Sequence, residues 1–221
     1  MSPSRVPISQ QELHYFGKVS ASVSHELKNV LAILNENAGL LQDFAAMAEQ
    51  GQPLDPDRIR RLAATMLGQI DRGDVIIKRM NRFAHSADED RATVDLDELV
   101  TMVVELFGRT AANRGVTVEV KTAVTTINIK TDPFALETLL GSLLYRITEA
   151  VPDIGTLNLE LGTQADDNLI RLPGLAEHAD MVTRILESND IKALLATLNG
   201  SAGFNQKNGE LVITLPGAIE T

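Results

Sequence analysis

The sequence predicts a two-part fold: an all-α helical hairpin that forms a dimeric four-helix bundle, followed by an α+β sandwich. Apolar residues recur at helical spacing through most of residues 10–86, which indicates long packed helices. From residue 95 onward, short alternating stretches are interspersed with capped helical patterns. The 221 residues are 44% hydrophobic, enough for a core in one or two domains. We therefore place a dimerisation domain at residues 9–86 and a second domain at residues 95–217.

The first helix is predicted to begin at a capping box, Ser9 to Glu12, and to run to about Glu49. Its apolar seam advances in steps of three and four, as in helices packed in a bundle. The seam positions are Phe16, Ser20, Val23, Leu27, Val30, Leu34, Asn37, Leu41, Phe44 and Ala48. Residues 51–56 break the helix, and Asp55 followed by Pro56 predicts the start of the next one.

The second helix carries a matching seam, so the two helices should form an antiparallel hairpin. Its seam positions are Ile59, Leu62, Met66, Gln69, Gly73, Ile76, Met80 and Phe83. Further apolar residues lie outside the two seams, among them Leu31, Leu67, Ile70 and Ile77. A single hairpin cannot bury them, which predicts that two hairpins pair into a homodimer. The alternative is that these faces pack on the second domain.

The second domain is predicted from a series of short elements after a polar linker at residues 86–92. We expect helices at residues 96–113, 133–150 and 174–198, the first two capped by Asp95 and Asp132. We expect strands at residues 116–120, 126–130, 157–161, 168–172, 204–206 and 210–215. The pair 157–161 and 168–172 should form a hairpin, as should the last two strands. This mixture favours helices on one face of a mixed sheet.

Composition excludes several classes of function. The formal net charge of −10 disfavours nucleic acid and anionic membrane as partners. There is no cysteine, hence no disulfide framework and no cysteine-based metal site. No apolar run approaches the ~20 residues that span a bilayer, and the N-terminus has no signal-peptide core. We expect a cytoplasmic protein whose sensing segment is missing or supplied by another chain.

One histidine of the first helix points away from the predicted core. With Val23 at heptad position d and Leu27 at a, His25 falls at f, opposite the seam. Residues three and four apart are neighbours on a helix, so Ser22, Lys28 and Asn29 are expected to share its solvated face. Imidazole on a rigid, exposed helix is a good nucleophile, and the adjacent Glu26 can accept the ring proton. The alternative reading is a surface histidine without function.

The stretch Ser24-His25-Glu26-Leu27-Lys28-Asn29 resembles the phosphoacceptor box of bacterial sensor histidine kinases. The resemblance implies that His25 is phosphorylated, that Glu26 is the catalytic acid/base, and that Asn29 positions water in a phosphatase reaction. It also implies that the hairpin is the dimerisation domain. The family usually has proline after the asparagine, where this chain has Val30. Proline would remove a helix hydrogen bond there, so we expect a straighter helix past the site.

The order of elements after the linker resembles the ATP-binding domain of the same family, with chemical departures. The stretch Ser142 to Ile147 takes the place of the family's Asn-Leu-Leu-x-Asn-Ala box, which puts Arg146 where the magnesium-binding asparagine would be. A guanidinium has no acceptor for a metal. The adenine-reading Asp-x-Gly-x-Gly corresponds to residues 172–177, which contain no Asp, and residues 175–199 contain no glycine. The sequence therefore predicts a degenerate nucleotide site at Ser142 and Arg146 that binds no cofactor.

The remaining candidates are weaker. His14, His85 and His178 are scattered without a second ligand at metal spacing, so we predict no metal site. Lys78, with Arg79 and Arg82, forms either a solvated face or a docking point for an acidic receiver domain.

Together these observations predict a bacterial two-component phosphoprotein of a phosphorelay. It would exchange phosphoryl groups with a response-regulator receiver domain, or dephosphorylate it, without using ATP itself. The receiver would supply the magnesium. One alternative is an ATP-dependent sensor histidine autokinase with a divergent pocket. The other is a non-catalytic dimeric adaptor. The sequence leaves open whether the chain is an enzyme, and autokinase activity is the less favoured reading.

Overall fold

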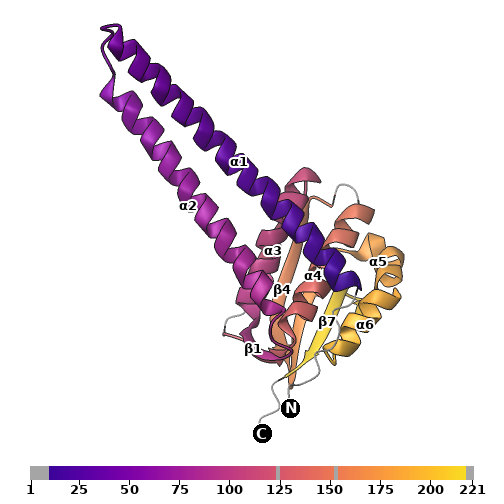
Figure 1. Cartoon of the computed structure of the whole chain (residues 1–221). Helices are drawn as coiled ribbons and strands as arrows, with labels where there is room; N and C mark the ends of the chain where they lie inside the picture. Colours follow the sequence, from indigo (N-terminus) through magenta and orange to yellow (C-terminus); the bar gives the residue numbers. More distant parts are fainter. Residues whose placement is uncertain (1–9, 123–124, 152–153, 218–221) are drawn as a thin grey trace, which may run out of the picture. The chain divides into compact units, whose positions relative to one another are not determined.

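The computed structural model describes residues 10–122, 125–151 and 154–217. It contains a helical hairpin followed by an α/β domain with a mixed sheet (Figure 1). In chain order the elements are α1 (Gln10–Glu49), α2 (Pro56–Ser86), β1 (Ala92–Asp95), α3 (Leu96–Asn113), β2 (Thr117–Lys121), β3 (Asn128–Thr131), α4 (Pro133–Ala150), β4 (Thr156–Gln164), β5 (Asp167–Leu172), the 3₁₀ helix η1 (Ala176–His178), α5 (Ala179–Leu186), α6 (Asn189–Thr197), β6 (Ser201–Asn205) and β7 (Glu210–Pro216). By contacts, the chain divides into two compact units, Ser20–Arg82 and a unit that contains residues 10–19 and 83–217.

The hairpin unit follows the predicted seams. Every seam residue of both helices is buried or half-buried, and Val23, Val30 and Phe44 of α1 are among the most buried. Gly73 of α2 lies so close to α1 that a Cβ atom there would be 3.5 Å from Cγ1 of Val30. The predicted cap of α2 is confirmed, since the backbone N–H of Asp57 donates to Oδ1 of Asp55 at 2.9 Å. Ser9, the predicted cap of α1, lies outside the described residues.

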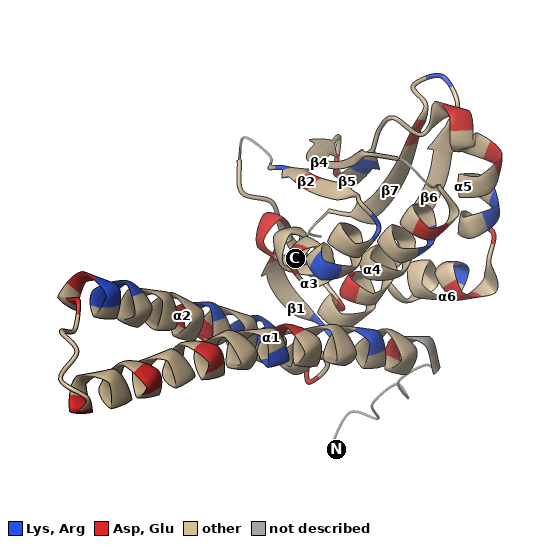
Figure 2. Ribbon diagram, turned by 90° about the horizontal axis from the view of Figure 1, so that it is seen from above, with Lys and Arg blue, Asp and Glu red and all other residues tan. Residues whose placement is uncertain are grey.

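The α/β unit is built on a five-stranded sheet of order β2-β4-β5-β7-β6. Only β2 and β4 are parallel, and the other neighbours are antiparallel. Helices α3 and α4 cover one face of this sheet (Figure 2). The core between them includes Leu136, Leu140, Leu159 and Ile170, all essentially inaccessible to solvent. This is the predicted arrangement of helices on one face of a mixed sheet.

The structure corrects several details of the predicted second domain, among them strand β6, which spans Ser201–Asn205 where 204–206 was predicted. Residues 92–95 form strand β1 instead of the end of a linker, because they pair antiparallel with β3 in a separate two-stranded sheet. Strand β3 begins at Asn128, two residues later than predicted. The predicted helix 174–198 is divided into η1, α5 and α6. The break before α6 falls at Ser188, whose extended backbone places it as the residue that precedes the helix.

Four aromatic rings join the ends of the hairpin helices to α4 within the α/β unit. Phe83 is fully buried and lies 5.7, 5.6 and 5.6 Å, between ring centroids, from Tyr15, Phe16 and Phe134 respectively. The ring of Tyr15 fits against Gly141, where a Cβ atom would be about 2.1 Å from the phenol oxygen. Burial, together with the charge of Glu137, raises the pKa of the Tyr15 phenol. Residues 10–19 are therefore part of the core of this unit.

Candidate functional site

The predicted phosphoacceptor residues lie near the middle of α1, in the hairpin unit. Val23 and Val30 of the seam are buried, whereas His25 and Asn29 are exposed and Glu26 is half-buried. Asn29 lies four residues after His25 and three after Glu26, so its side chain is a neighbour of both on the helix surface. The imidazole is therefore accessible to another molecule. The helix that carries it is held by the buried seam residues, and the exposed His25 side chain adds little to that packing.

The solvated face around His25 is narrower than predicted. Lys28 and Asn29 are exposed, but Ser22 is only half-exposed and its hydroxyl oxygen is buried. Within the described part of the chain, that oxygen has no hydrogen-bond partner. The short serine side chain keeps its oxygen close to the helix, where neighbouring atoms cover it. Ser22 is therefore not part of the exposed face that His25 and Asn29 share.

The basic residues late in α2 do not form a simple cationic patch. The Lys78 ammonium lies 2.7 Å from Oδ2 of Asp74, one helical turn earlier, and both side chains are largely exposed. Arg82 is exposed and Arg79 is half-buried. Exposed ion pairs of this kind contribute little to the stability of the fold. Lys78 and Asp74 therefore present one positive and one negative charge to solvent, side by side.

Arg146, which was predicted to take the position of the family's magnesium ligand, is held by an internal ion pair. It lies on α4, and its guanidinium contacts both carboxylate oxygens of Asp190 in the first turn of α6. Its Nη1 also donates to the hydroxyl of Ser188 at 3.0 Å. Both partners belong to the segment that takes the place of the family's glycine-rich loop. The bidentate ion pair between the guanidinium and the Asp190 carboxylate thus links α6 to α4.

The loop that corresponds to the adenine-reading segment is packed into the protein. Leu175, within the residues 172–177 that were predicted to correspond to the family's adenine-reading segment, is fully buried and belongs to the hydrophobic core. Its backbone N–H donates to the carbonyl of Gly209, in the β6–β7 turn, at 2.9 Å. A Cβ atom at Gly209 would be 2.7 Å from that of Ala176, so loop and turn are in close contact. Glycine is required at 209 for this approach and for its positive φ of 64°.

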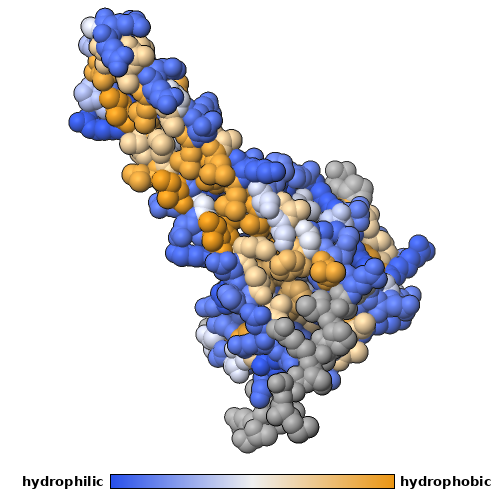
Figure 3. Space-filling model, in the orientation of Figure 1, coloured by the Kyte–Doolittle hydropathy of each residue, from blue (hydrophilic) through white to orange (hydrophobic). Residues whose placement is uncertain are grey.

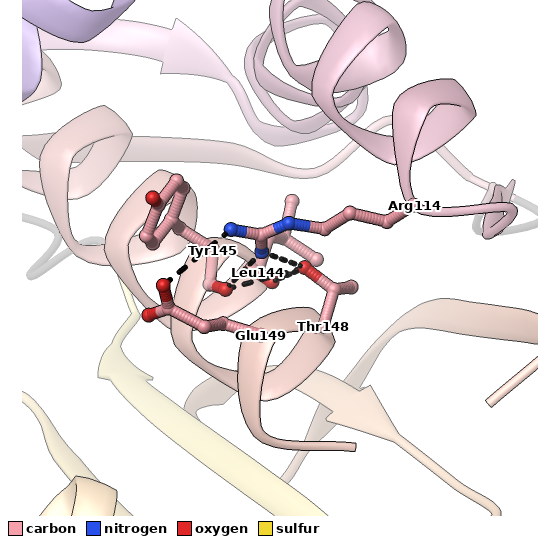
Figure 4. A network of polar contacts seen from close by, with 5 residues as sticks. All are labelled: Arg114, Leu144, Tyr145, Thr148 and Glu149. Carbon is pink, nitrogen blue, oxygen red and sulfur yellow. Dashed lines mark hydrogen bonds and ion pairs between the residues drawn. The ribbon is translucent and has the colours of Figure 1, made fainter. Parts of the chain in front are cut away.

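A second polar network on α4 was not predicted (Figure 4). Arg114, at the end of α3, donates to the carbonyl of Tyr145 at 2.6 Å and to the hydroxyl of Thr148 at 2.7 Å. The guanidinium carbon lies 4.2 Å from the centroid of the Tyr145 ring, and the Lys18 ammonium lies 3.5 Å from the same centroid. Partial burial lowers the pKa of Lys18, and the nearby charges of Arg114 and Arg146 act in the same direction, against the opposing charge of Glu149. The predicted sequence pattern offered no signal for this contact, because its members come from three helices.

The scattered histidines remain separate in the structure. His14 and His85 are exposed, and His178 is half-exposed. Nδ1 of His85 lies 2.9 Å from Oδ2 of Asp88. Within residues 10–122, 125–151 and 154–217, no three histidine or carboxylate side chains converge in a way that could hold a metal ion. In the same ranges, no helix is both long and apolar enough to cross a membrane.

Comparison with known proteins finds sensor histidine kinases. The chain is 24% identical over 161 residues to sensor histidine kinase ZraS of Salmonella typhimurium, which covers 73% of this chain and 33% of that protein. It is 25% identical over 150 residues to ZraS of Klebsiella oxytoca, with 68% and 31% covered. The chain thus spans about a third of the length of these curated relatives. No protein-family model matches it.

Among solved structures, similar chains are also histidine kinases. The Acinetobacter baumannii histidine kinase AdeS matches with a TM-score of 0.46 and 14% identity, over 85% of this chain and 98% of that chain. The ATP-binding domain of PrrB from Mycobacterium tuberculosis matches with a TM-score of 0.48 and 16% identity, over 59% and 99%.

The described fold, a helical hairpin followed by an α/β domain, agrees with what the sequence relatives indicate. Over about 70% of its length the chain is similar to bacterial sensor histidine kinases, and we describe it as histidine kinase-like.

Proposed function

We propose that this chain is a dimeric histidine phosphotransfer protein that exchanges phosphoryl groups with the aspartate of a receiver domain, or removes them, without using ATP itself. The observation that carries the proposal is a contrast between the two units. The stretch that resembles the phosphoacceptor box matches the family from Ser24 to Asn29, and His25 is exposed, whereas Arg146, predicted at the position of the metal ligand, is paired to Asp190. On this proposal the chain keeps the group that accepts phosphate and does without the groups that would activate ATP.

The transfer needs only groups that the chain and a receiver supply. An imidazole nitrogen of His25 attacks the phosphorus of the receiver's phosphoaspartate, a P–N bond forms, and the P–O bond to the aspartate breaks. The aspartate carboxylate leaves, and the proton on the other ring nitrogen passes to Glu26. Magnesium, which neutralises charge on the moving phosphoryl group, is expected on the receiver. The same steps in reverse pass the phosphoryl group from His25 to a receiver.

Asn29 is proposed to act in hydrolysis. It stands one helical turn beyond His25 and is exposed on the same face. Its amide can accept a hydrogen bond from a water molecule or donate one to it, which would aim the water at the phosphoaspartate. His25 and Asn29 would then divide transfer and hydrolysis between them.

Dimerisation is proposed from the apolar side chains that the hairpin leaves outside its seams. Leu31, Leu67, Ile70 and Ile77 are 63, 62, 53 and 48% exposed. The space-filling view shows an apolar band along the hairpin (Figure 3). Exposed patches of this kind mark interaction sites in soluble proteins. A second hairpin would cover them in a four-helix bundle, as the resemblance to histidine kinases implies.

The test of the proposed function is phosphotransfer from a phosphorylated receiver to the chain, followed on Phos-tag gels or by acid-labile ³²P. The wild type should acquire acid-labile phosphate, and His25→Gln should acquire none while keeping its circular dichroism and melting temperature. His14→Gln, which removes another exposed histidine of the same helix, is the matched control and should label like the wild type. Labelling of His25→Gln would disprove the site.

Two further outcomes separate the alternatives. Labelling of His25 from ATP and magnesium, without a receiver, would establish the autokinase alternative. Absence of transfer from any cognate receiver, with a folded dimer, would favour the non-catalytic adaptor. Receivers encoded beside this chain's gene are the first ones to test.

A further inference from the structure

The sheet of the α/β unit has a hollow on the face opposite α3 and α4. Its volume is about 580 Å³, within the ~300–1,000 Å³ range of small-molecule sites. It is lined by outward side chains of β4, β5 and β7 and by the β6–β7 turn. None of the residues assigned to phosphotransfer or to the nucleotide-site remnant belongs to it. We call it the sheet hollow.

Two glycines lie in the rows of residues that border the sheet hollow, and a Cβ atom on one of them, Gly162, would be 3.5 Å from Nη1 of Arg171. Two adjacent rows of residues cross the sheet: Glu160, Arg171, Val212 and Gly203 in one, and Gly162, Leu169, Thr214 and Ser201 in the other. One row ends in Gly203 on β6, where a Cβ atom would meet nothing within 4 Å, and the other begins with Gly162 on β4. Glycine inside a strand weakens it, and often marks the close approach of a ligand or another backbone.

Arg171 brings a positive charge that the protein does not neutralise. The strand register places it beside Glu160, the carboxylate expected to pair with it. Glu160 instead accepts a hydrogen bond from Lys121, on its other side, at 2.8 Å. No other described residue forms a hydrogen bond or ion pair with Arg171. A half-buried guanidinium to which no carboxylate is bonded can bind an anionic group of a ligand.

Glu210 brings a negative charge that is fixed in position. The residue is buried, and its Oε1 accepts from the amides of Asn208 at 2.9 Å and Asn205 at 3.3 Å. The amide of Asn205 is oriented in turn, because its oxygen accepts from the backbone N–H of Lys207 at 3.1 Å. A carboxylate has about four acceptor positions, so Glu210 keeps capacity for a cationic donor.

These charges select the ligand. Arg171 is opposite Val212 on β7, so Glu210 is its diagonal neighbour, at a typical separation of about 7–8 Å. The two side chains can therefore hold opposite ends of one small molecule, with Leu169 and Val212 as an apolar floor between them. Two carboxylates on the rim disfavour polyanions, and Arg171 disfavours metal dications. We propose that the sheet hollow binds a small zwitterion of the α-amino acid class, its carboxylate on Arg171 and its ammonium on Glu210.

The test is a thermal-shift screen of the full chain against the twenty amino acids, one at a time, with calorimetry on any that shift the melting temperature. At ten times the dissociation constant, a ligand that binds only the folded state should raise the melting temperature by about 3–6 °C. Arg171→Gln should abolish the rise. Arg184→Gln, at an exposed arginine of α5 outside the hollow, is the matched control and should keep it.

A second variant tests the site without changing its charge. Gly203→Val places a side chain in open space beside Val212, which lines the hollow, so the chain should fold, and binding should be lost because the added side chain narrows the hollow. The proposal is overturned if no amino acid shifts the melting temperature or gives heat of binding. It is also overturned if the shift persists in both Arg171→Gln and Gly203→Val, since the ligand would then bind elsewhere.

Discussion

The contact between Arg146 and Asp190 can be weighed by a double-mutant cycle of Arg146→Gln, Asp190→Asn and the pair. The Arg146 side chain is 35% exposed and that of Asp190 is 14% exposed. Exposed pairs contribute about 0.2–1 kcal/mol, and breaking a fully buried pair costs about 3–5 kcal/mol. Discounted for the solvent at Arg146, each single substitution should lower the free energy of local opening at α6 by about 1–2 kcal/mol, which corresponds to about 5- to 30-fold faster exchange.

Hydrogen exchange of the α6 amides, read by mass spectrometry, measures this opening directly, with the peptide from α3 as internal reference. Because both singles remove the same interaction, the double variant should exchange little faster than the worse single. Asp180→Asn with Arg184→Gln on α5 is a matched control of two exposed residues, and should leave α6 unchanged. Additive effects in the double variant, or unchanged exchange in the singles, would refute a coupling between α4 and α6.

The same variants bear on nucleotide binding. Arg146→Asn replaces the guanidinium with the amide that the histidine kinase family uses, yet we expect no heat of binding with ATP and magnesium. Residues 172–177, where the resemblance implies the adenine-reading carboxylate, still contain no Asp, and the backbone of Leu175 stays bonded to Gly209. The wild type should likewise show none. Micromolar binding by the wild type would revive the autokinase alternative and contradict this account of the site.

Three other perturbations have defined outcomes. Asn29→Ala should leave transfer to His25 nearly intact but slow loss of phosphate from the receiver by about 10- to 100-fold, the effect of one positioning hydrogen bond; an equal loss of both rates would make it a docking residue. The double substitution Leu67→Glu with Ile70→Glu should give a monomer by light scattering at micromolar concentration, whereas Gln42→Glu, at an exposed polar residue, should not. Burial raises the pKa of Asp132, so the folded chain binds the carboxyl proton more tightly than the unfolded chain does, and the stability from this group falls as the pH rises above the usual ~3.9. Asp132→Asn should flatten that part of a plot of melting temperature against pH. A plot parallel to that of the wild type would assign the pH dependence to other groups.

Elements with strong local signals could be predicted almost to the residue. Helix α3 begins after Asp95, whose side chain accepts from the N–H of Glu98, and α4 begins after Asp132, which accepts from Ala135. Each cap lies within three residues of the donor that it satisfies, so the signal is written in adjacent sequence. The heptad seams are equally local, and they placed His25 on the face where the structure has it.

Elements that depend on distant partners could not be predicted. Strand β1 lies between the end of the predicted linker at Ala92 and the predicted helix cap at Asp95, and it forms a strand because β3, more than thirty residues later, pairs with it. Arg146 and Asp190, which form an ion pair, are 44 residues apart in the sequence. Asp190 lies at the start of α6, where the structure interrupts the single helix predicted at residues 174–198. The sheet hollow depends on strand register, which brings Glu160, Arg171 and Val212 from three strands into one row.

The α/β unit has an internal contact at each place where the resemblance to histidine kinases implies a contact with nucleotide. Asp190 meets Arg146 at the metal position, and the buried Leu175 stands in the adenine-reading loop. A domain that had merely lost its ligand would keep an open, weakly held segment there, because ordering that segment costs conformational entropy. These contacts offset that cost without a ligand. The same unit buries Tyr15 and Phe83, the ends of the hairpin helices, against Phe134. The packing of those helix ends is therefore a structural role that the α/β unit fills without a nucleotide.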